Sequence, residues 1–215
     1  MSLFTGLLDA RVAIAEMAIT DAPSGAMPEE EQAVAHAVAR RRREFLTGRI
    51  CARKALAEIG GPAVALPSGL DRMPVWPQDY VGSITHTNRD CAAAVASRDT
   101  GILSIGIDLE PAEALPADLW ETVCSADERA WLSTHPEPQR GILARAIFSA
   151  KECAFKCQFP LTRQMLEFHE VGLTLDLANG TFTAQFHHAV RPRPTAVGKL
   201  RITAQHIASA MTLAD

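Results

Sequence analysis

One long helical pattern constrains the fold of this chain more than any other feature. The pattern over residues 139–159 predicts the strongest helix in the sequence, and Pro160 is expected to stop it. Glu152 and Lys156 lie four residues apart, so they share one face of that helix and form a favourable pair in this order. Any fold must therefore place this charged face beside a partner or a ligand.

A short strand pattern ending in acids is the natural partner for that face. Residues 105–110 are predicted to form a strand, which sends Asp108 and Glu110 out on the same side. If Glu152 joins them, three carboxylates raise one another's pKa. A hard divalent cation such as Mg²⁺ resolves that repulsion, and it commonly takes substrate phosphates as further ligands. The pattern indicates phosphoryl transfer.

Length and charge narrow the class of protein. A chain of 215 residues can bury a full core, as one large domain or two small halves in close contact. Its 25 acids against 21 Lys and Arg give a net charge of −4, which argues against a general nucleic-acid binder.

The cysteines and the apolar runs indicate where the protein works. Five cysteines, an odd number without a CxxC pair, are typical of a reducing compartment. We see no signal-peptide pattern at the start and no run near the ~18 apolar residues of a membrane helix. We therefore expect a cytoplasmic protein without a membrane span.

The first half is predicted to contain a strand, two helices and more strands. Residues 11–20 suit a strand, and a helix is expected to begin at Pro28 and to carry residues 33–38. A basic helix follows over residues 40–56, in which Arg49 and Arg53 should repel each other unless an anion lies between them. Considered alone, a solvated basic face is the commoner explanation of such a run.

Two further strand patterns lead to the acids. Residues 81–85 run into His86, and residues 91–97 are a candidate buried strand. A tight turn then leads to residues 102–109, and this order of strand, turn and strand predicts a hairpin.

The second half is predicted to be helical first and then a small antiparallel sheet. A helix is expected over residues 120–132, and strands over 171–177, 181–188 and 200–214, with a tight turn at Asn179-Gly180. The sequence therefore predicts a mixed α/β (α+β) protein with two halves of similar content.

Five motifs in this order together resemble the 4'-phosphopantetheinyl transferase family: RREFLTGRICARKAL, PVWP, GSITH, GIDLE and FSAKECAFK. The resemblance covers residues 40–160 and is strongest to the siderophore-synthesis branch, related to the enterobactin and surfactin-synthetase transferases. It implies two similar α/β halves in a pseudo-twofold arrangement, which we place at residues 1–104 and 105–215. A monomer would suffice, because one chain holds both halves.

The family implies a reaction and its partners. Coenzyme A and Mg²⁺, or Mn²⁺ in its place, would lie in the cleft between the halves. The phosphopantetheine arm would pass to a serine of an apo acyl or peptidyl carrier protein, with release of 3',5'-ADP, as in holo-[acyl-carrier-protein] synthases. Siderophore, non-ribosomal peptide, polyketide and fatty-acid carriers all remain open as substrates.

The resemblance assigns roles to the acids and the lysine. Asp108, Glu110 and Glu152 match the family's metal-binding acids, and Glu152 also matches a general base for the serine hydroxyl, directly or through water. Lys156 matches a lysine that neutralises the pyrophosphate or protonates the leaving group. The chemistry is consistent, since attack on phosphorus needs charge stabilisation and a proton acceptor.

The resemblance also assigns the binding of coenzyme A to residues that meet its phosphates. His86, with Thr85 before it, matches a histidine that contacts a phosphate of coenzyme A, and arginine binds phosphate oxygens bidentately. The expected coenzyme A contacts are Arg41, Arg49, Arg53, Arg72, Thr85, His86, Asp108 and Lys156.

Two alternatives remain. The same acids could serve another Mg²⁺-dependent phosphoryl-transfer or hydrolase reaction. The chain could also be a coenzyme A or carrier-protein binding module without catalysis, although the matched set of Asp108, Glu110, Glu152 and Lys156 argues against that.

Overall fold

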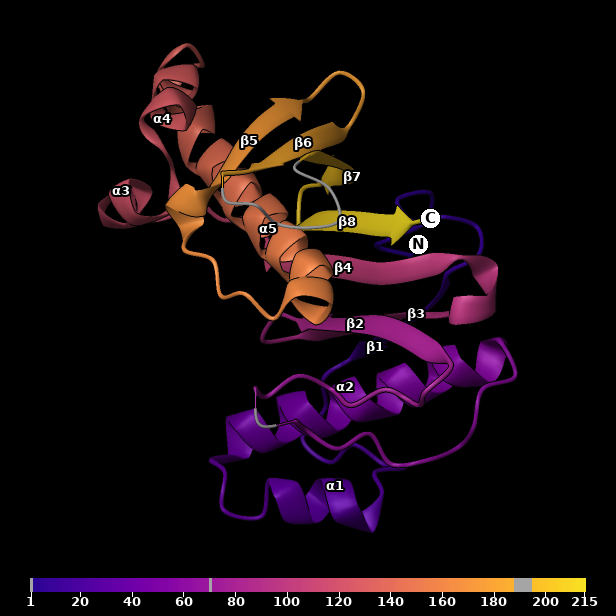
Figure 1. Cartoon of the computed structure of the whole chain (residues 1–215). Helices are drawn as coiled ribbons and strands as arrows, with labels where there is room; N and C mark the ends of the chain where they lie inside the picture. Colours follow the sequence, from indigo (N-terminus) through magenta and orange to yellow (C-terminus); the bar gives the residue numbers. More distant parts are fainter. Residues whose placement is uncertain (1, 70, 188–194) are drawn as a thin grey trace.

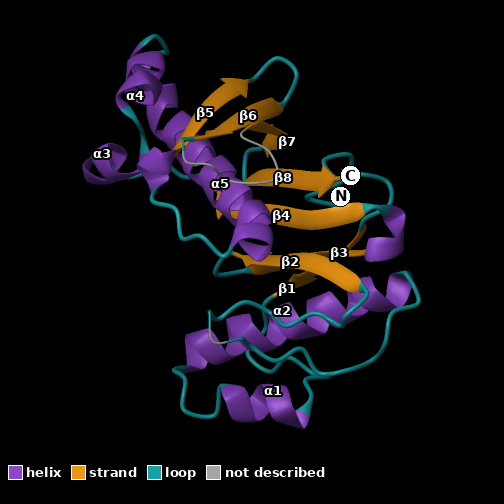
Figure 2. Cartoon of the chain, in the orientation of Figure 1, coloured by secondary structure: helices purple, strands orange, loops and turns teal. Residues whose placement is uncertain are grey.

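The structure is a computed structural model that describes residues 2–69, 71–187 and 195–215. Within these residues the chain forms two antiparallel sheets, and a long helix packs on each (Figures 1 and 2). This mixed α+β arrangement confirms the predicted fold class.

The first sheet has three strands in the order β1-β3-β2. They are β1 (Ala13–Ala18), β2 (Tyr80–His86) and β3 (Asp90–Ser97). Helix α2 (Ala39–Glu58) packs small side chains against this sheet, and the short helix α1 (Pro28–Ala33) lies outside α2 (Figure 1).

The second sheet has five strands in the order β4-β8-β7-β6-β5. The strands are β4 (Ile102–Pro111), β5 (Val171–Asp176), β6 (Thr181–Phe186), β7 (Thr195–Ile202) and β8 (His206–Ala214). Helix α5 (Glu137–Thr162) crosses one face of this sheet (Figure 1). It comes so close to β4 that a Cβ at Gly106 would lie 2.0 Å from the Cys153 carbonyl oxygen.

Short helices connect these elements. Helices α3 (Trp120–Val123) and α4 (Ala126–Ser133) precede α5, and 3₁₀ turns span Arg98–Thr100, Ala117–Leu119 and Phe168–Glu170. All five cysteines are buried and free, each within the described part of the chain.

The two sheets meet along β2 and β4 without a backbone ladder. The Ser83 hydroxyl accepts a hydrogen bond from Ile107 N at 3.2 Å, and the Thr85 hydroxyl accepts one from Leu109 N at 3.0 Å. Side-chain oxygens of β2 thus satisfy the outer N–H groups of β4, which would otherwise be buried without partners. We call this contact the seam.

The predicted hairpin between residues 91–97 and 102–109 is wrong. Strand β3 is the centre of its sheet, with β1 on one side and β2 on the other, so it has no free edge for β4. Strand β4 pairs with β8 instead, from more than 90 residues further along the chain. Alternation of apolar residues identified both strands but could not identify their neighbours.

Four predicted boundaries are also wrong. The first helix ends at Ala33 instead of reaching residue 38. The helix predicted over residues 120–132 is two helices, because the Ser125 hydroxyl accepts from Glu128 N and caps a new helix. The strand predicted over 200–214 is β7 and β8.

The fourth boundary is the end of the long helix. Helix α5 runs through Pro160 to Thr162, because a proline in the last turn costs few hydrogen bonds. The remaining strands agree with the prediction, except that residue 188 lies outside the described residues.

Candidate functional site

The predicted acids and lysine meet at the seam. Asp108 lies on β4 and is 3% exposed, and Lys156 reaches it from α5 with 2.6 Å between Nζ and Oδ1. Glu110, two residues further along β4, pairs with Arg145 of α5 at 3.0 Å. The strand and helix faces predicted from spacing are therefore the faces that contact each other.

The charges of this cluster act on one another. Burial raises the pKa of Glu110 to about 7, and the charge of Asp108 adds to that rise while Arg145 opposes it. Burial also raises the pKa of Glu152. The positive charge of Lys156 opposes this rise, and the negative charge of Asp108 adds to it. For Lys156, burial favours the neutral amine, but Asp108 and Glu152 outweigh it, so its pKa is raised. The group has more negative charge than the protein neutralises.

One oxygen of this cluster lacks a partner. Asp108 Oδ2 is buried without a hydrogen bond from any described residue, although such atoms normally have one. The Glu152 carboxylate likewise has no hydrogen-bond or ion-pair partner within the described part of the chain. An unsatisfied carboxylate oxygen beside two further carboxylates suits a hard cation that prefers oxygen ligands.

The acids do not form a ready metal cage. Within residues 2–69, 71–187 and 195–215, no three His, Cys, Asp or Glu side chains are grouped so that they could hold a metal ion. Lys156 and Arg145 occupy positions on Asp108 and Glu110. These bases compete with a cation for Asp108 Oδ1 and Glu110 Oε2, whereas Asp108 Oδ2 has no partner among the described residues.

Thr85 and His86 lie at the end of β2, next to the acids. The Thr85 hydroxyl donates to Asp108 Oδ1 at 3.4 Å, and His86 Nδ1 lies 3.2 Å from the Thr87 carbonyl oxygen. Burial lowers the pKa of His86, with Glu44 opposing and Lys156 and Arg41 adding to the fall. His86 is thus within electrostatic range of both long helices.

Arg49 and Arg53 are engaged by the protein itself. Arg49 is buried and donates to the Leu66 carbonyl at 2.6 Å and to Ser68 Oγ at 3.0 Å. Burial lowers its pKa to about 10. Arg53 pairs with the buried carboxylate of Glu30. Neither side chain lies on a solvated face, and Glu30 supplies the anion that their spacing called for.

Arg41 and Arg72 differ from that pair because both are exposed. Neither guanidinium has a hydrogen-bond or ion-pair partner among the residues described. Arg72 also has a left-handed backbone, with φ 65°. They are the members of the predicted basic set that remain available to an anion.

Sequence reasoning missed several residues that build the site. Arg145 lies seven residues before Glu152, two helical turns away on the same face, and that spacing could have revealed it. Lys151 is 2% exposed and pairs with Glu128 at 2.9 Å. The signal for Glu128 was the capping box that begins at Ser125.

A small hollow adjoins Glu152. It has a volume of about 150 Å³, and its walls are Lys151, Glu152, Phe155, Met165, Leu166, Glu167, Phe168 and Val171. Met165 is 74% exposed at its rim.

Comparison with known proteins shows the family. The model of the 4'-phosphopantetheinyl transferase superfamily matches residues 104–210, and that of the 4'-phosphopantetheinyl transferase N-terminal domain matches residues 29–96. The chain belongs to the 4'-phosphopantetheinyl transferase superfamily. This confirms the resemblance drawn from the five motifs, and with it the prediction of a phosphopantetheinyl transferase.

Three relatives show how similar the chain is to individual proteins of the family. The chain is 41% identical to the 4'-phosphopantetheinyl transferase Npt of Nocardia iowensis over 175 residues, 81% of this chain and 78% of the relative. It is 37% identical to PptT of Mycobacterium tuberculosis over 162 residues, 74% and 70% of the two chains. It is 38% identical to enterobactin synthase component D of Escherichia coli over 123 residues, 56% of each.

A helix that crosses a bilayer must be long and apolar. None of the helices in the described ranges combines the length and the apolar character that crossing a bilayer requires.

Proposed function

We propose that the protein transfers the phosphopantetheine arm of coenzyme A to a serine of an apo acyl or peptidyl carrier protein and releases 3',5'-ADP. The observation that carries this proposal is the cluster at the seam, where Lys156 meets Asp108 and one Asp108 oxygen stays buried without a partner. Such a centre can bind the cation and the pyrophosphate together.

The acids would hold the metal ion. Asp108, Glu110 and Glu152 offer oxygen ligands to Mg²⁺, or to Mn²⁺ in its place. Burial raises the pKa of Glu110 and of Glu152, and the charge of Asp108 adds to both rises. When bound, the cation neutralises charge on the phosphates of coenzyme A.

Glu152 and Lys156 would carry the proton chemistry. The raised pKa of Glu152 makes its carboxylate a stronger base for the serine hydroxyl, while the side chain lies beside the hollow that could admit the arm. Lys156 stays protonated because Asp108 and Glu152 hold its charge, so it can donate to the pyrophosphate or the leaving group.

The basic side would bind the nucleotide end. Arg41, Arg72 and His86, supported by Thr85, can meet the 3'-phosphate and the pyrophosphate. Arg49 and Arg53 belong to the same coenzyme A-binding segment. Their engagement with Leu66, Ser68 and Glu30 indicates that they hold its shape.

We place the protein among holo-[acyl-carrier-protein] synthase type transferases of siderophore, non-ribosomal peptide or polyketide synthesis. It acts as a cytoplasmic monomer with halves at residues 1–104 and 105–215. The exposed apolar rim at Met165 is where a carrier protein could dock.

Intact-mass spectrometry tests this function. An apo peptidyl carrier protein incubated with the protein, coenzyme A and Mg²⁺ should gain one phosphopantetheine, ~340 Da, and should fail to gain it with a chelator or with Glu152→Gln. The matched control is Glu121→Gln, an exposed glutamate of α3. Free phosphopantetheine as the product would indicate a hydrolase, and coenzyme A binding without any product would indicate a binding module.

A further inference from the structure

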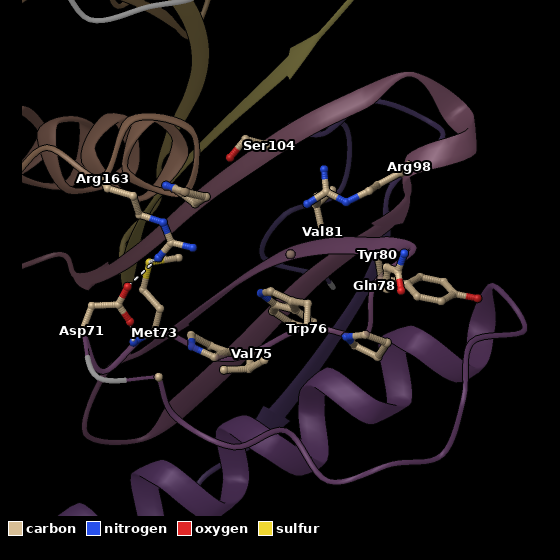
Figure 3. A pocket seen from close by; sticks show the side chains of 15 residues that line it. Asp71, Met73, Val75, Trp76, Gln78, Tyr80, Val81, Arg98, Ser104 and Arg163 are labelled. Carbon is tan, nitrogen blue, oxygen red and sulfur yellow. Dashed lines mark hydrogen bonds and ion pairs between the residues drawn. The ribbon is translucent and has the colours of Figure 1, made fainter.

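Two of the contacts that join the halves differ in kind. The seam between β2 and β4 is buried. The second connection is exposed: Arg163 Nη1 lies 2.5 Å from Asp71 Oδ2, and their side chains are 63% and 31% exposed (Figure 3). Arg163 Nη1 also lies 3.8 Å from Met73 Sδ.

Both ends of this exposed pair have unusual backbones. Arg163, at the end of α5, has φ 58°, and Arg72, next to Asp71, has φ 65°. They are the two non-glycine residues with positive φ in the described part of the chain. A helix commonly ends in this conformation with glycine. An arginine persists there when its surroundings hold it, and such strain concentrates at functional sites.

The segment that carries Asp71 is anchored in the first half. Val75 N donates to the Pro67 carbonyl at 2.8 Å and Gly69 N to the Met73 carbonyl at 2.8 Å, which closes a small loop. The preceding Leu66 is fixed from both sides, because Arg49 binds its carbonyl and Glu30 accepts from its N–H.

A hollow of about 490 Å³ lies between the seam and the exposed pair. Val81, Gly82 and Ser104 line it on the side of the seam, and Asp71, Met73 and Arg163 line it on the side of the pair (Figure 3). Because the space is hollow, packed side chains do not fix the loop relative to the end of α5 there. The contact of Arg163 with Asp71 and Met73 makes that connection.

We propose that Asp71 and Arg163 are positioning residues for coenzyme A. The pair fixes the loop that presents Arg72 relative to α5, which carries Glu152 and Lys156. This inference rests on the proposed function. Coenzyme A has phosphate groups at two separate places, so it binds best when the cations and acids that receive them are already correctly spaced. Preorganisation of this kind raises affinity without a new contact to the ligand.

Isothermal titration of coenzyme A in the presence of Mg²⁺ tests the pair as a double-mutant cycle. Exposed ion pairs contribute little, so Asp71→Asn and Arg163→Gln should each weaken binding by about threefold to fivefold. The double variant should bind no more weakly than either single one. The exchange of charges, Asp71→Arg with Arg163→Asp, should restore part of the affinity. In turnover assays KM for coenzyme A should rise while kcat stays unchanged.

Two controls separate positioning from folding. Arg163→Gly removes the side chain but favours the left-handed backbone, so the melting temperature should hold or rise while coenzyme A affinity still falls. Asp9→Asn removes the charge of Asp9 from its ion pair with Arg11. The side chains of Asp9 and Arg11 are 34% and 45% exposed, similar to the Asp71–Arg163 pair, and this variant should leave coenzyme A affinity unchanged.

The outcomes are distinguishable. If the unaltered protein neither binds coenzyme A nor modifies a carrier, the proposed function fails. If it does both and Asp71→Asn binds equally well, or if the two single effects simply add, the positioning role is overturned.

Discussion

The two long helices each carry two charged residues at the same spacing and use them in opposite ways. Helix α2 places Arg49 and Arg53 four residues apart, and α5 places Glu152 and Lys156 at the same spacing. In α2 the protein supplies the partners, including the buried carboxylate of Glu30. In α5, Lys156 forms an ion pair with Asp108, while Glu152 has no partner among the described side chains.

Two glutamates make the contrast specific. Glu30 is 1% exposed and receives hydrogen bonds from Arg53 and from the backbone N–H groups of Met27 and Leu66. Glu152 is half-buried and receives none from the described residues. A fully satisfied carboxylate holds the scaffold, whereas an unsatisfied one beside other acids is a candidate for binding or catalysis.

The largest effect is expected at Glu152. Glu152→Gln should lower kcat by about 10²- to 10⁴-fold, because it removes the proposed general base. Stability should hold or rise slightly, since burial disfavours the ionised carboxylate of Glu152 more than Lys156 favours it, as the raised pKa of Glu152 indicates. Carrier modification by intact mass and urea unfolding measure the two effects. A variant that unfolds easily but turns over normally would reverse the comparison.

Glu30 should show the opposite result. Glu30→Ala leaves Arg53 without its carboxylate and should destabilise the protein by about 3–5 kcal/mol, as expected when one partner of a buried pair is removed. Urea unfolding measures it, with Glu31→Ala, an exposed neighbour, as the control. A loss below about 1 kcal/mol would mean that the pair is no more than a surface ion pair.

Thr85 belongs both to the seam and to the site, because its hydroxyl contacts Leu109 N and Asp108 Oδ1. Thr85→Val removes the hydroxyl that Leu109 N donates to, which should cost about 1–3 kcal/mol. Thr85→Ser keeps that hydroxyl and should recover most of the stability. Equal losses in both variants, measured by urea unfolding, would show that the methyl group and not the hydrogen bond stabilises the seam.

The smallest effect is a pH dependence from His86. Burial lowers its pKa in the folded protein below the ordinary value of 6.5. The unfolded chain therefore binds the proton first as pH falls, so the free energy of unfolding should decrease below about pH 6.5. His86→Gln should flatten this part of the stability curve. A stability that rises on acidification through the same range, and does so in a His86-dependent way, would contradict the assigned direction.

The elements of the fold were largely predictable and their arrangement was not. Strands β1, β2 and β3 and helices α2 and α5 follow from local periodicity, which reports the face that each element buries. The pairing of β4 with β8 was missed because it joins segments that are distant in sequence. The Ser83 and Thr85 hydroxyls, which replace a ladder at the seam, carry no periodic signal.

The sequence by itself determined the family and the helix and strand faces that carry the charged residues, because motif order and spacing along one element are local properties. Only the tertiary structure decided which charges are free. Arg49 and Arg53 on α2 and Lys156 on α5 are all basic residues of long helices. They differ only in what the rest of the chain brings against them: a carbonyl and a hydroxyl for the first, Glu30 for the second and Asp108 for the third. Pairing across long sequence separations sets those environments, and burial then sets their strength.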